Sequence, residues 1–256
     1  MSNPMAPALP ELSPRQEVAL LARILYREGY DDHLAGHITL KLDDDTLLVN
    51  PFGMPWDEVR AADIMRIDLD GNVVEGPWTV TPAITLHLEL HKMRHDVGVA
   101  VHNHPRWGTI WADIGRAPEI YDQTSAMYHG EVAVYHDYPG PVNEPANAQD
   151  IAKVMGSANV CLLANHGVLI VGPDVRFAYL RSAVFEWRCR QAWHVAAAGG
   201  GHPMRADVAA EFGEMFNHVP FPGLFDAMAR RELRADPSIL DESVNENARR
   251  ASGGPS

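Results

Sequence analysis

Short strand-like stretches that come in neighbouring pairs constrain most strongly how this chain of 256 residues can fold. Residues 38–42 and 46–50 form one pair, and the three aspartates between them have the composition of a turn. Residues 160–164 and 168–171 form a second pair, joined by three residues. Strands connected by a short turn pair in the antiparallel sense. Because helical segments separate the pairs, the pattern predicts a largely antiparallel sheet covered by helices.

Three helices carry start or stop signals in the sequence. Ser13-Pro14 places an N-cap before a proline at the first helical position, and Gly29 ends that helix. Thr81-Pro82 opens a helix over about 82–94 in the same way, and a long helix runs from Asp174 to the glycines at 199–201. The other expected elements are helices over 106–114, 121–128 and 147–155 and within 207–235, strands over 97–102 and 132–135, and a hairpin over 67–74.

A single domain is expected to account for most of the chain. Apolar residues make up 46% of the sequence, which is ample for a core, and neither an internal repeat nor a linker is present. Residues 1–12 hold three prolines and are expected to form a flexible arm. We expect residues 13–240 to form the domain and residues 241–256 to form a disordered tail.

The charge balance excludes several classes of partner. The chain has 21 Lys+Arg against 34 Asp+Glu, a net charge of −13, so neither nucleic acid nor an anionic membrane surface is an expected partner. The sequence has no run of 18 or more apolar residues, which predicts no membrane span, and the N-terminus lacks a signal-peptide pattern. Two cysteines are too few for a disulfide framework. These features predict a cytoplasmic protein that acts on a small molecule.

Histidine is the unusual residue, with 13 copies. His102 and His104 follow a strand-like run, and their spacing puts both imidazoles on one face, where they could converge on an ion. The alternative is that one of them is hydrogen-bonded and the other solvated. His166 lies between Asn165 and Gly167, which tolerate a sharp turn, so it should project from the end of the sheet, and the alternative is a turn histidine without a role. Three histidines with an open position suit a catalytic Zn, Fe, Mn or Co ion, and not Ca.

The two histidine motifs together resemble those of the class II aldolase/adducin family. Val101-His102-Asn103-His104 is followed some sixty residues later by Asn165-His166-Gly167. Further resembling segments occur in the same order over roughly 13–200: Ala35 to Thr39, Asn50 to Gly53, Ile64 to Gly71, His87 to Val97, and the long helix with Glu186. The resemblance implies an α/β/α domain with a central, mainly antiparallel sheet. It also implies a ring-shaped homo-oligomer, often a tetramer, with active sites near subunit boundaries.

Carried over by position, the resemblance makes His102, His104 and His166 the metal ligands, with one divalent ion per subunit and Zn favoured. The family's sugar-phosphate aldolases place a catalytic Glu four residues before the position of His87, and here that position is Ala83. Their serine and asparagine ligands for the substrate phosphate are also mostly replaced, although Thr81 keeps one hydroxyl. A phosphorylated sugar is therefore not the expected substrate.

The chemistry that remains is cleavage of a carbon–carbon bond beside a metal-bound oxygen. Aldol cleavage needs a base for the hydroxyl proton, whereas decarboxylation needs only an acid that reprotonates the carbanion. The missing Glu favours a decarboxylase of a small hydroxy acid, an aromatic one included, as in the family's decarboxylases. A retro-aldol aldolase with another base stays open. So do a non-catalytic adducin-like scaffold and a metal-dependent dehydratase or oxygenase on the same fold.

Several side chains could replace the missing carboxylate as acid or base. His87 is favoured because its family position lies near the metal, and His37 and Tyr128 are the next catalytic candidates. The further candidates are His91, His129 and Glu131. His87 and His91 are one helical turn apart, so the alternative is that both belong to a helix face packed on the sheet.

Three residues are expected to bind the substrate. Gly36 lies in the segment that resembles the family's Gly-rich loop, and Gly53 lies in the Pro-x-Gly turn. Arg106, just after the histidine strand, could hold a substrate carboxylate through two parallel hydrogen bonds, although a surface arginine without a role is the alternative.

Overall fold

The computed structural model describes residues 9–32, 35–43, 45–130, 132–137, 140, 142–219, 221 and 223–243. Most of the expected arm (1–8), most of the expected tail (244–256) and the acid/base candidate Glu131 lie outside these residues. In the last part of the expected arm, Leu9 and Leu12 pack against the hydrophobic core.

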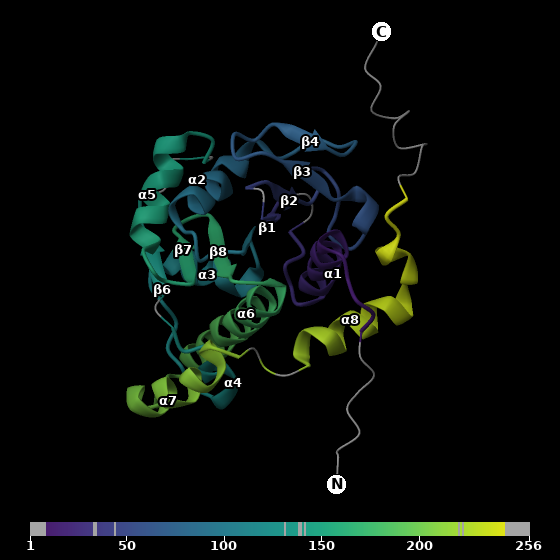
Figure 1. Cartoon of the computed structure of the whole chain (residues 1–256). Helices are drawn as coiled ribbons and strands as arrows, with labels where there is room; N and C mark the ends of the chain where they lie inside the picture. Colours follow the sequence, from purple (N-terminus) through teal and green to yellow (C-terminus); the bar gives the residue numbers. More distant parts are fainter. Residues whose placement is uncertain are drawn as a thin grey trace.

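A single sheet organises the described part of the chain (Figure 1). Its eight strands have the order β4-β3-β2-β1-β5-β8-β7-β6. All neighbouring strands pair antiparallel except β6 and β7, which are parallel because helix α5 provides the crossover between them. The mainly antiparallel α/β fold predicted from the sequence is therefore confirmed. The strands are β1 (His37–Lys41), β2 (Leu47–Val49), β3 (Met65–Ile67), β4 (Val73–Glu75), β5 (Val99–Asn103), β6 (Val132–Tyr135), β7 (Val160–Leu163) and β8 (Gly167–Gly172).

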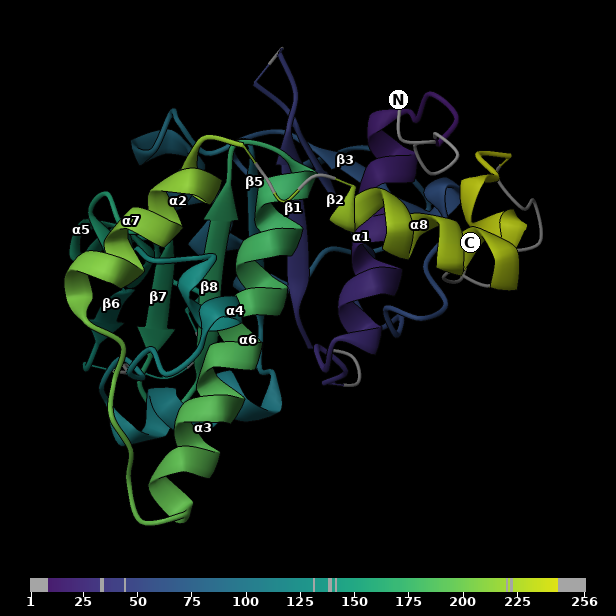
Figure 2. The ribbon, with the colours of Figure 1, turned by 90° about the horizontal axis from the view of Figure 1, so that it is seen from below.

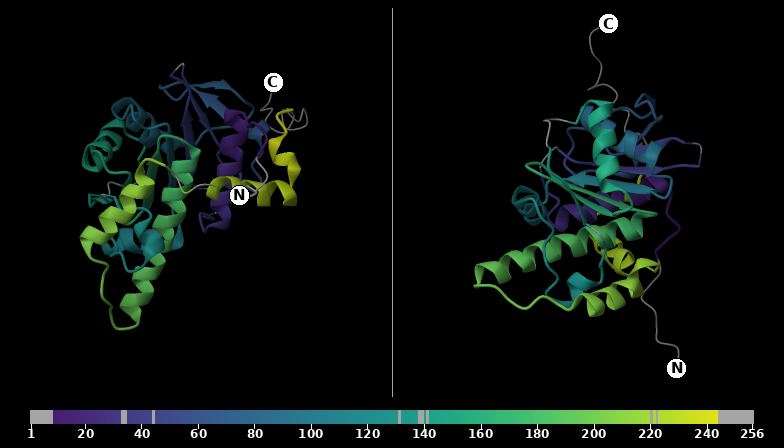
Figure 3. Two further views of the ribbon diagram at one scale, coloured as in Figure 1. Left: turned by 60° about the horizontal axis from the view of Figure 1, so that its bottom comes forward. Right: turned by 90° about the vertical axis from the view of Figure 1, so that its left-hand side faces the viewer.

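Helices cover both faces of the sheet, which gives the α/β/α layers seen in Figure 3. On one face lie α1 (Pro14–Arg27), α3 (Arg106–Ile114), α6 (Val175–Ala197) and α8 (Leu224–Ala235), and on the other lie α2 (Thr85–Met93) and α5 (Pro145–Met155). The smaller elements are α4 (Gln123–Ala126), α7 (Ala206–Asn217), η1 (Ala61–Asp63), η2 (Pro82–Ile84) and η3 (Pro237–Leu240). No helix among the described residues has the length and apolar character needed to cross a membrane.

Most of the expected elements are confirmed, with shifts at their ends. Helix α1 begins after Ser13, whose side chain accepts a hydrogen bond from the Gln16 backbone, as the Ser-Pro signal predicts. The helix predicted over 82–94 instead starts with the 3-10 turn η2, and α2 proper begins at Thr85. The helix predicted over 121–128 is only the four residues of α4, capped by Asp122.

Strand alternation separates two sets of side chains along β1 and β5. Ile38 and Val101 belong to the core cluster that faces α1 and α6, whereas Ala100 belongs to the cluster that faces α2 and α5. Because successive side chains point to opposite faces, His37 and His102 lie on the α2 side. These two residues are also partners in the β1–β5 register.

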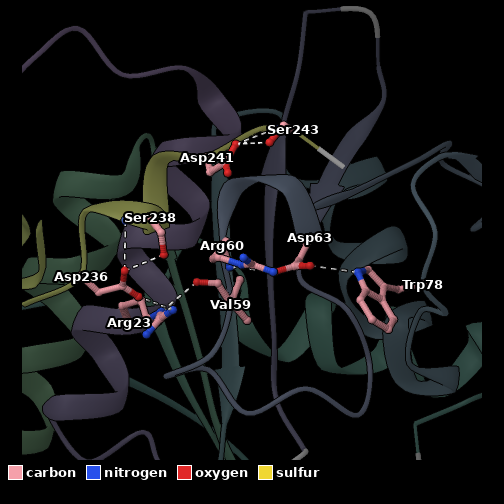
Figure 4. Close-up of polar contacts among 9 residues, drawn as sticks. All are labelled: Arg23, Val59, Arg60, Asp63, Trp78, Asp236, Ser238, Asp241 and Ser243. Carbon is pink, nitrogen blue, oxygen red and sulfur yellow. Dashed lines mark hydrogen bonds and ion pairs between the residues drawn. The ribbon is translucent and has the colours of Figure 1, made fainter. Parts of the chain in front are cut away.

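The C-terminal segment is tied to helix α1 by a set of contacts that we call the Arg23 network (Arg23, Val59, Asp236 and Ser238). Figure 2 shows α8 beside α1, and Figure 4 shows the contacts of the residues that come after α8 in the chain. Arg23 Nε donates to the Val59 carbonyl at 2.8 Å, and its Nη2 lies 3.3 Å from Asp236 Oδ2. Asp236 is the N-cap of η3, and it accepts hydrogen bonds from the backbone and hydroxyl of Ser238.

A second pair of contacts in Figure 4 fixes the loop around η1. Arg60 lies 3.6 Å from Asp63 as an ion pair, and the indole of Trp78 donates to the same carboxylate at 3.2 Å. The segment before β3 is thereby held against the segment before η2. Both segments are well separated in sequence from the two histidine motifs.

Candidate active site

Three histidines meet at one end of the sheet. His102 is on β5, His104 follows the end of that strand, and His166 is in the turn between β7 and β8. Ring centroids are 5.1 Å apart for His102 and His104, 4.7 Å for His102 and His166, and 4.8 Å for His104 and His166. Each residue offers one nitrogen, and the three nitrogens all lie within 4.8 Å of one another. We call these residues the histidine triad.

The turn that carries His166 is built from the residue types that its geometry requires. Asn165 has a φ of 56°, in the left-handed region that asparagine tolerates, and the backbone N–H of His166 donates to the Leu163 carbonyl at 3.0 Å. A Cβ atom on Gly167 would collide with the His104 ring and with the backbone oxygen before it. The sharp turn and the close approach of β5 therefore both depend on the Asn165-His166-Gly167 sequence.

Two members of the histidine triad have their second nitrogen already occupied. Nδ1 of His102 donates to the Val168 carbonyl at 2.9 Å, and because a carbonyl can only accept, the proton is on Nδ1. Nδ1 of His104 lies 2.5 Å from Asp32 Oδ2, an acceptor in its ionised form. Both rings consequently present Nε2 as a bare nitrogen, the arrangement by which outer carboxylates and carbonyls orient metal-binding imidazoles.

The residues of the triad fit a divalent cation. Nε2 of His104 is buried and has no hydrogen-bond partner among the described residues, so its lone pair is unused. The group that the described residues form contains three imidazoles and no carboxylate. Three neutral imidazoles with an open position suit zinc or a similar transition metal, while a hard cation such as calcium prefers oxygen.

Behind the triad, a row of polar side chains runs between the sheet and α2, which we call the histidine column (His37, His87, Thr39 and His91). The His37 ring is 5.0 Å from that of His102 and 4.2 Å from that of His87. The Thr39 hydroxyl lies 2.8 Å from Nδ1 of His87 and 2.8 Å from Nε2 of His91. All four residues of the column are buried.

Burial keeps these histidines uncharged. It lowers the pKa of His37 to about 3, and with the neighbouring histidines it keeps the pKa of His87 and of His102 well below the usual value. Burial also lowers the pKa of His91 and of His166 to about 4. Neutral imidazole is the form that binds a metal, so at neutral pH these rings need lose no proton to do so.

The structure brings some of the expected catalytic residues together and leaves one apart. His37 contacts His102 of the triad, His87 contacts His37, and Ala83 lies in η2, one turn before His87. Tyr128 instead belongs to the core cluster on the α6 side of the sheet, where its ring is 5.9 Å from the Arg181 guanidinium. Burial raises the pKa of Tyr128 to about 12, so it is a neutral phenol.

The expected substrate-binding residues occupy three different settings. Gly36 has a φ of +108°, and a Cβ there would collide with Asn103, so this position has a packing reason to be glycine. Gly53 has a φ of +80° and open space around it, in the turn after β2. Arg106 is exposed at the start of α3 and lines a surface cavity of about 370 Å³, beside Trp107.

Sequence reasoning missed the residues that orient the site. Asp32 is 72 positions from His104, and nothing in the local sequence marks it as a partner. Thr39 looks like an ordinary strand residue until α2 packs over it. Glu186 was named in the sequence only as part of the long helix that resembles the family; it is buried and accepts hydrogen bonds at 2.8 Å from the backbone of Trp107 and of the following residue, which fixes the start of α3. Burial raises the pKa of Glu186 to about 7.

The chain belongs to the class II aldolase and adducin family: the family model "Class II Aldolase and Adducin N-terminal domain" matches residues 16–193. It is 32% identical over 231 residues to a 4-hydroxy-3-prenylphenylpyruvate oxygenase/4-hydroxy-3-prenylbenzoate synthase of Streptomyces roseochromogenus subsp. oscitans, covering 88% of this chain and 83% of that protein. It is 30% identical over 201 residues to a 3,4-dihydroxyphthalate decarboxylase of Arthrobacter keyseri, covering 73% and 80%.

Solved structures confirm the fold. An L-fuculose 1-phosphate aldolase from Glaciozyma antarctica PI12 superposes with a TM-score of 0.78 at 24% identity, over 88% of this chain and 90% of that chain. The family resemblance predicted from the two histidine motifs is therefore confirmed. The relatives include lyases of more than one type, so membership in the family does not by itself select the reaction.

Proposed function

We propose that this protein is a divalent-metal-dependent carbon–carbon lyase, and that its reaction is decarboxylation of a small hydroxy acid, with an aromatic one favoured. The observation that carries the proposal is the convergence of three imidazole nitrogens within 4.8 Å of one another. Two of these rings are oriented by contacts of their Nδ1 atoms with the Val168 carbonyl and with Asp32. A non-catalytic adducin-like scaffold would have no use for a site of this kind.

In this proposal His102, His104 and His166 hold one divalent ion per chain. Zinc is favoured, and Mn, Fe and Co are the alternatives that imidazole ligands also suit. When bound, the ion supplies a Lewis acid that stabilises negative charge on a hydroxyl or carbonyl oxygen of the substrate. Asp32 and the Val168 carbonyl hold two of the rings in the ligand orientation and fix which nitrogen is bare.

Decarboxylation is favoured over aldol cleavage by what lies around the triad. Ala83 has no proton-transferring group, and the triad itself includes no carboxylate. Aldol cleavage requires a base, whereas loss of carbon dioxide requires only proton delivery to the carbanion. His87 and His37 are the proposed acid/base residues, because His37 packs against His102 of the triad and His87 packs against His37. A catalytic role for Tyr128 stays a prediction, because its side chain packs on the face of the sheet opposite the histidine column.

The proposed substrate contacts follow from charge and access. Arg106 is an exposed guanidinium two residues after His104, and it would pair with a substrate carboxylate. Gly36 and Gly53 would allow the substrate to approach the backbone near β1 and β2. The decarboxylase relative, whose name specifies a dihydroxylated aromatic acid, supports an aromatic substrate for this chain.

Two further reactions are candidates for the same site. The Streptomyces relative is named as an oxygenase, which favours oxygen-dependent cleavage as the second candidate. A retro-aldol reaction is the third, supported by an L-fuculose phosphate aldolase of Methanocaldococcus jannaschii at 27% identity. We further propose a cytoplasmic homotetramer with sites near the subunit boundaries, as the family resemblance implies.

Product analysis tests the proposed function. The Zn-, Mn-, Fe- and Co-loaded protein is incubated with a panel of hydroxybenzoates and dihydroxyphthalates, and carbon dioxide, aldehyde and oxygen uptake are measured together. We expect carbon dioxide release without oxygen uptake. Aldehyde release would replace the decarboxylase with the aldolase, and carbon dioxide release that depends on oxygen would replace it with the oxygenase.

A further inference from the structure

One hydroxyl group joins two buried imidazoles in the histidine column. Thr39 Oγ1 lies 2.8 Å from Nδ1 of His87 and 2.8 Å from Nε2 of His91, and all three side chains are fully buried. The two histidines are four residues apart on α2, so they present their rings to the same strand. Thr39 and His37 are two residues apart on β1 and share that face.

The chemistry of a hydroxyl group limits how this arrangement can be protonated. Thr39 has one proton to donate, so it can donate to only one of the two imidazoles, and at least one ring must donate to it. In the first state, Thr39 donates to His87, and His91 donates to Thr39 from Nε2. In the second state, His87 donates from Nδ1, and Thr39 donates to His91. The positions of the protons on the two rings are therefore coupled.

The surroundings of His91 favour the second state. Burial and Lys41 lower the pKa of His91, to about 4, while the Val97 backbone acts in the opposite direction. A backbone group raises the pKa of an imidazole when it accepts from a ring N–H. Nε2 of His91 already faces the Thr39 hydroxyl at 2.8 Å, so Nδ1 is the nitrogen left for a proton that the Val97 backbone favours. Nε2 of His91 is then the acceptor for the Thr39 hydroxyl.

The other end of the column shows why the protonation state would matter. Nε2 of His87 and Nε2 of His37 are both buried and have no hydrogen-bond partner among the described residues. Each buried unpaired polar atom is unfavourable, and here two of them lie on neighbouring rings. His87 contacts His37, which contacts His102 of the triad, so the two rings with unused nitrogens join the column to the metal end.

We propose that Thr39 and His91 are positioning residues that lock His87 in the Nδ1–H tautomer, so that His87 presents a bare Nε2 as a hydrogen-bond acceptor toward the active site. The inference rests on the proposed function for the identity of the donor: the acceptor receives a hydrogen bond from a hydroxyl group of the substrate. The substrate is thereby limited to compounds with a free hydroxyl group that donates a hydrogen bond to Nε2 of His87. A methyl ether has no such proton to donate.

The tautomers of His87 and His91 can be measured without substrate and without metal. Two-dimensional proton–nitrogen correlation spectra of the ¹⁵N-histidine-labelled, metal-free protein at pH 7.5 distinguish an imidazole nitrogen that carries a proton from a bare one. Assignment uses the His87→Gln and His91→Gln variants. We expect Nδ1–H and bare Nε2 for both residues. A protonated Nε2 on His87 would overturn the proposal, whatever the outcome of the product assay.

Substitution of Thr39 tests whether its hydroxyl sets the tautomer. Thr39→Val keeps the branched shape and removes the hydroxyl, so the two His87 nitrogen signals should move toward each other as both tautomers become populated. Thr39→Ser restores the hydroxyl and should restore the separate signals. The matched control is Thr109→Val, because the buried Thr109 hydroxyl has no hydrogen-bond partner among the described residues, and its spectrum should match the wild type.

The wild-type spectrum is decisive even if a variant does not fold. If Thr39→Val is unfolded, the spectra of the wild type and of Thr39→Ser still show which nitrogens of His87 and His91 carry a proton. An unchanged His87 signal in folded Thr39→Val would overturn the role of Thr39. A failed product assay with the expected tautomers would instead count against the proposed function alone.

Discussion

The histidine column and the Arg23 network are both built from polar side chains, but they complete their hydrogen bonds differently. In the Arg23 network the guanidinium and the carboxylate contact each other and nearby polar groups at the protein surface (Figure 4). In the histidine column Thr39 joins two imidazoles, yet Nε2 of His37 and of His87 have no partner among the described residues. The network is charged and partly exposed, whereas the column is neutral and buried.

This difference indicates which region carries function. A buried polar atom without a partner costs about 1–3 kcal/mol, and folds seldom retain several of them without a use. Exposed ion pairs contribute about 0–1 kcal/mol and are common on any surface. The unused nitrogens gathered around the triad and the column therefore support the proposal that the active site lies there, while the Arg23 network attaches the C-terminal segment.

Removal of a triad histidine should have the largest effect. The His104→Ala variant is expected to lose metal binding and to fall to background activity, because two imidazoles do not hold a catalytic ion firmly. Its fold and oligomeric state should stay intact, as measured by circular dichroism and size-exclusion chromatography. The control is His218→Ala, whose side chain is 80% exposed and which should keep full activity. Retained turnover in His104→Ala would contradict the metal mechanism.

Acid should weaken the metal-free protein through the buried histidines. The pKa is about 3 for His37 and about 4 for His91 and His166 in the folded protein, against 6.5 ordinarily, so the unfolded chain binds more protons between pH 6.5 and 4. The free energy of unfolding should therefore fall as pH drops through that window, by up to about 4 kcal/mol per pH unit for three histidines.

The Arg23 network should respond in a different pH window. Hydrogen bonds from Ser238 lower the pKa of Asp236 from its usual 3.8, so its contribution is present above that value and is lost only at lower pH. Urea unfolding at pH 7.5, 6.5, 5.5 and 4.5 therefore excludes Asp236 and reports on the buried histidines, against the smaller and opposite contribution of the single Glu186 carboxyl, whose pKa is raised to about 7. A free energy of unfolding that stays flat over this range would contradict the neutral, buried state of the column.

The outer partner of His104 should have an intermediate effect. Asp32→Asn keeps the size of the side chain and removes its charge, so the His104 ring loses its preferred proton position. Metal affinity is expected to fall about 10–100-fold, as for other outer partners of metal-binding histidines. Competition with a chelator measures this change, and Asp31→Asn is the neighbouring control. Equal affinity in Asp32→Asn and wild type would mean that the carboxylate does not orient the ring.

The smallest effect is expected in the Arg23 network. Asp236→Asn should lower the free energy of unfolding by no more than about 1 kcal/mol, because the carboxylate is partly exposed and keeps an amide in its place. Activity and metal content should not change. A loss of activity in this variant would remove the distinction between a structural and a functional polar region.

The sequence predicted the triad because its signals are local. The His-x-His spacing follows from strand alternation, and the Asn165-His166-Gly167 turn requires residue types that the sequence displays directly. The helix and strand positions were predicted for similar reasons, since caps, prolines and apolar patterns act over a few residues. What the sequence could not show were contacts between distant segments.

Three such contacts illustrate the limit. Asp32 reaches His104 across 72 positions, and Thr39 meets His91 only when α2 packs on β1. The parallel pairing of β6 with β7 depends on where α5 crosses, which no local pattern specifies. Tyr128 was an acid/base candidate only because it precedes a strand, and its core contacts lie on the α6 side.

The metal content of the purified protein tests the central claim most directly. Protein produced without a histidine tag and dialysed against zinc-supplemented, then zinc-free, buffer is analysed for metals by elemental analysis, beside His104→Ala treated in the same way. The account predicts one divalent ion per chain in the wild type and almost none in the variant. A folded wild-type protein without bound metal, or equal metal in both proteins, would contradict it.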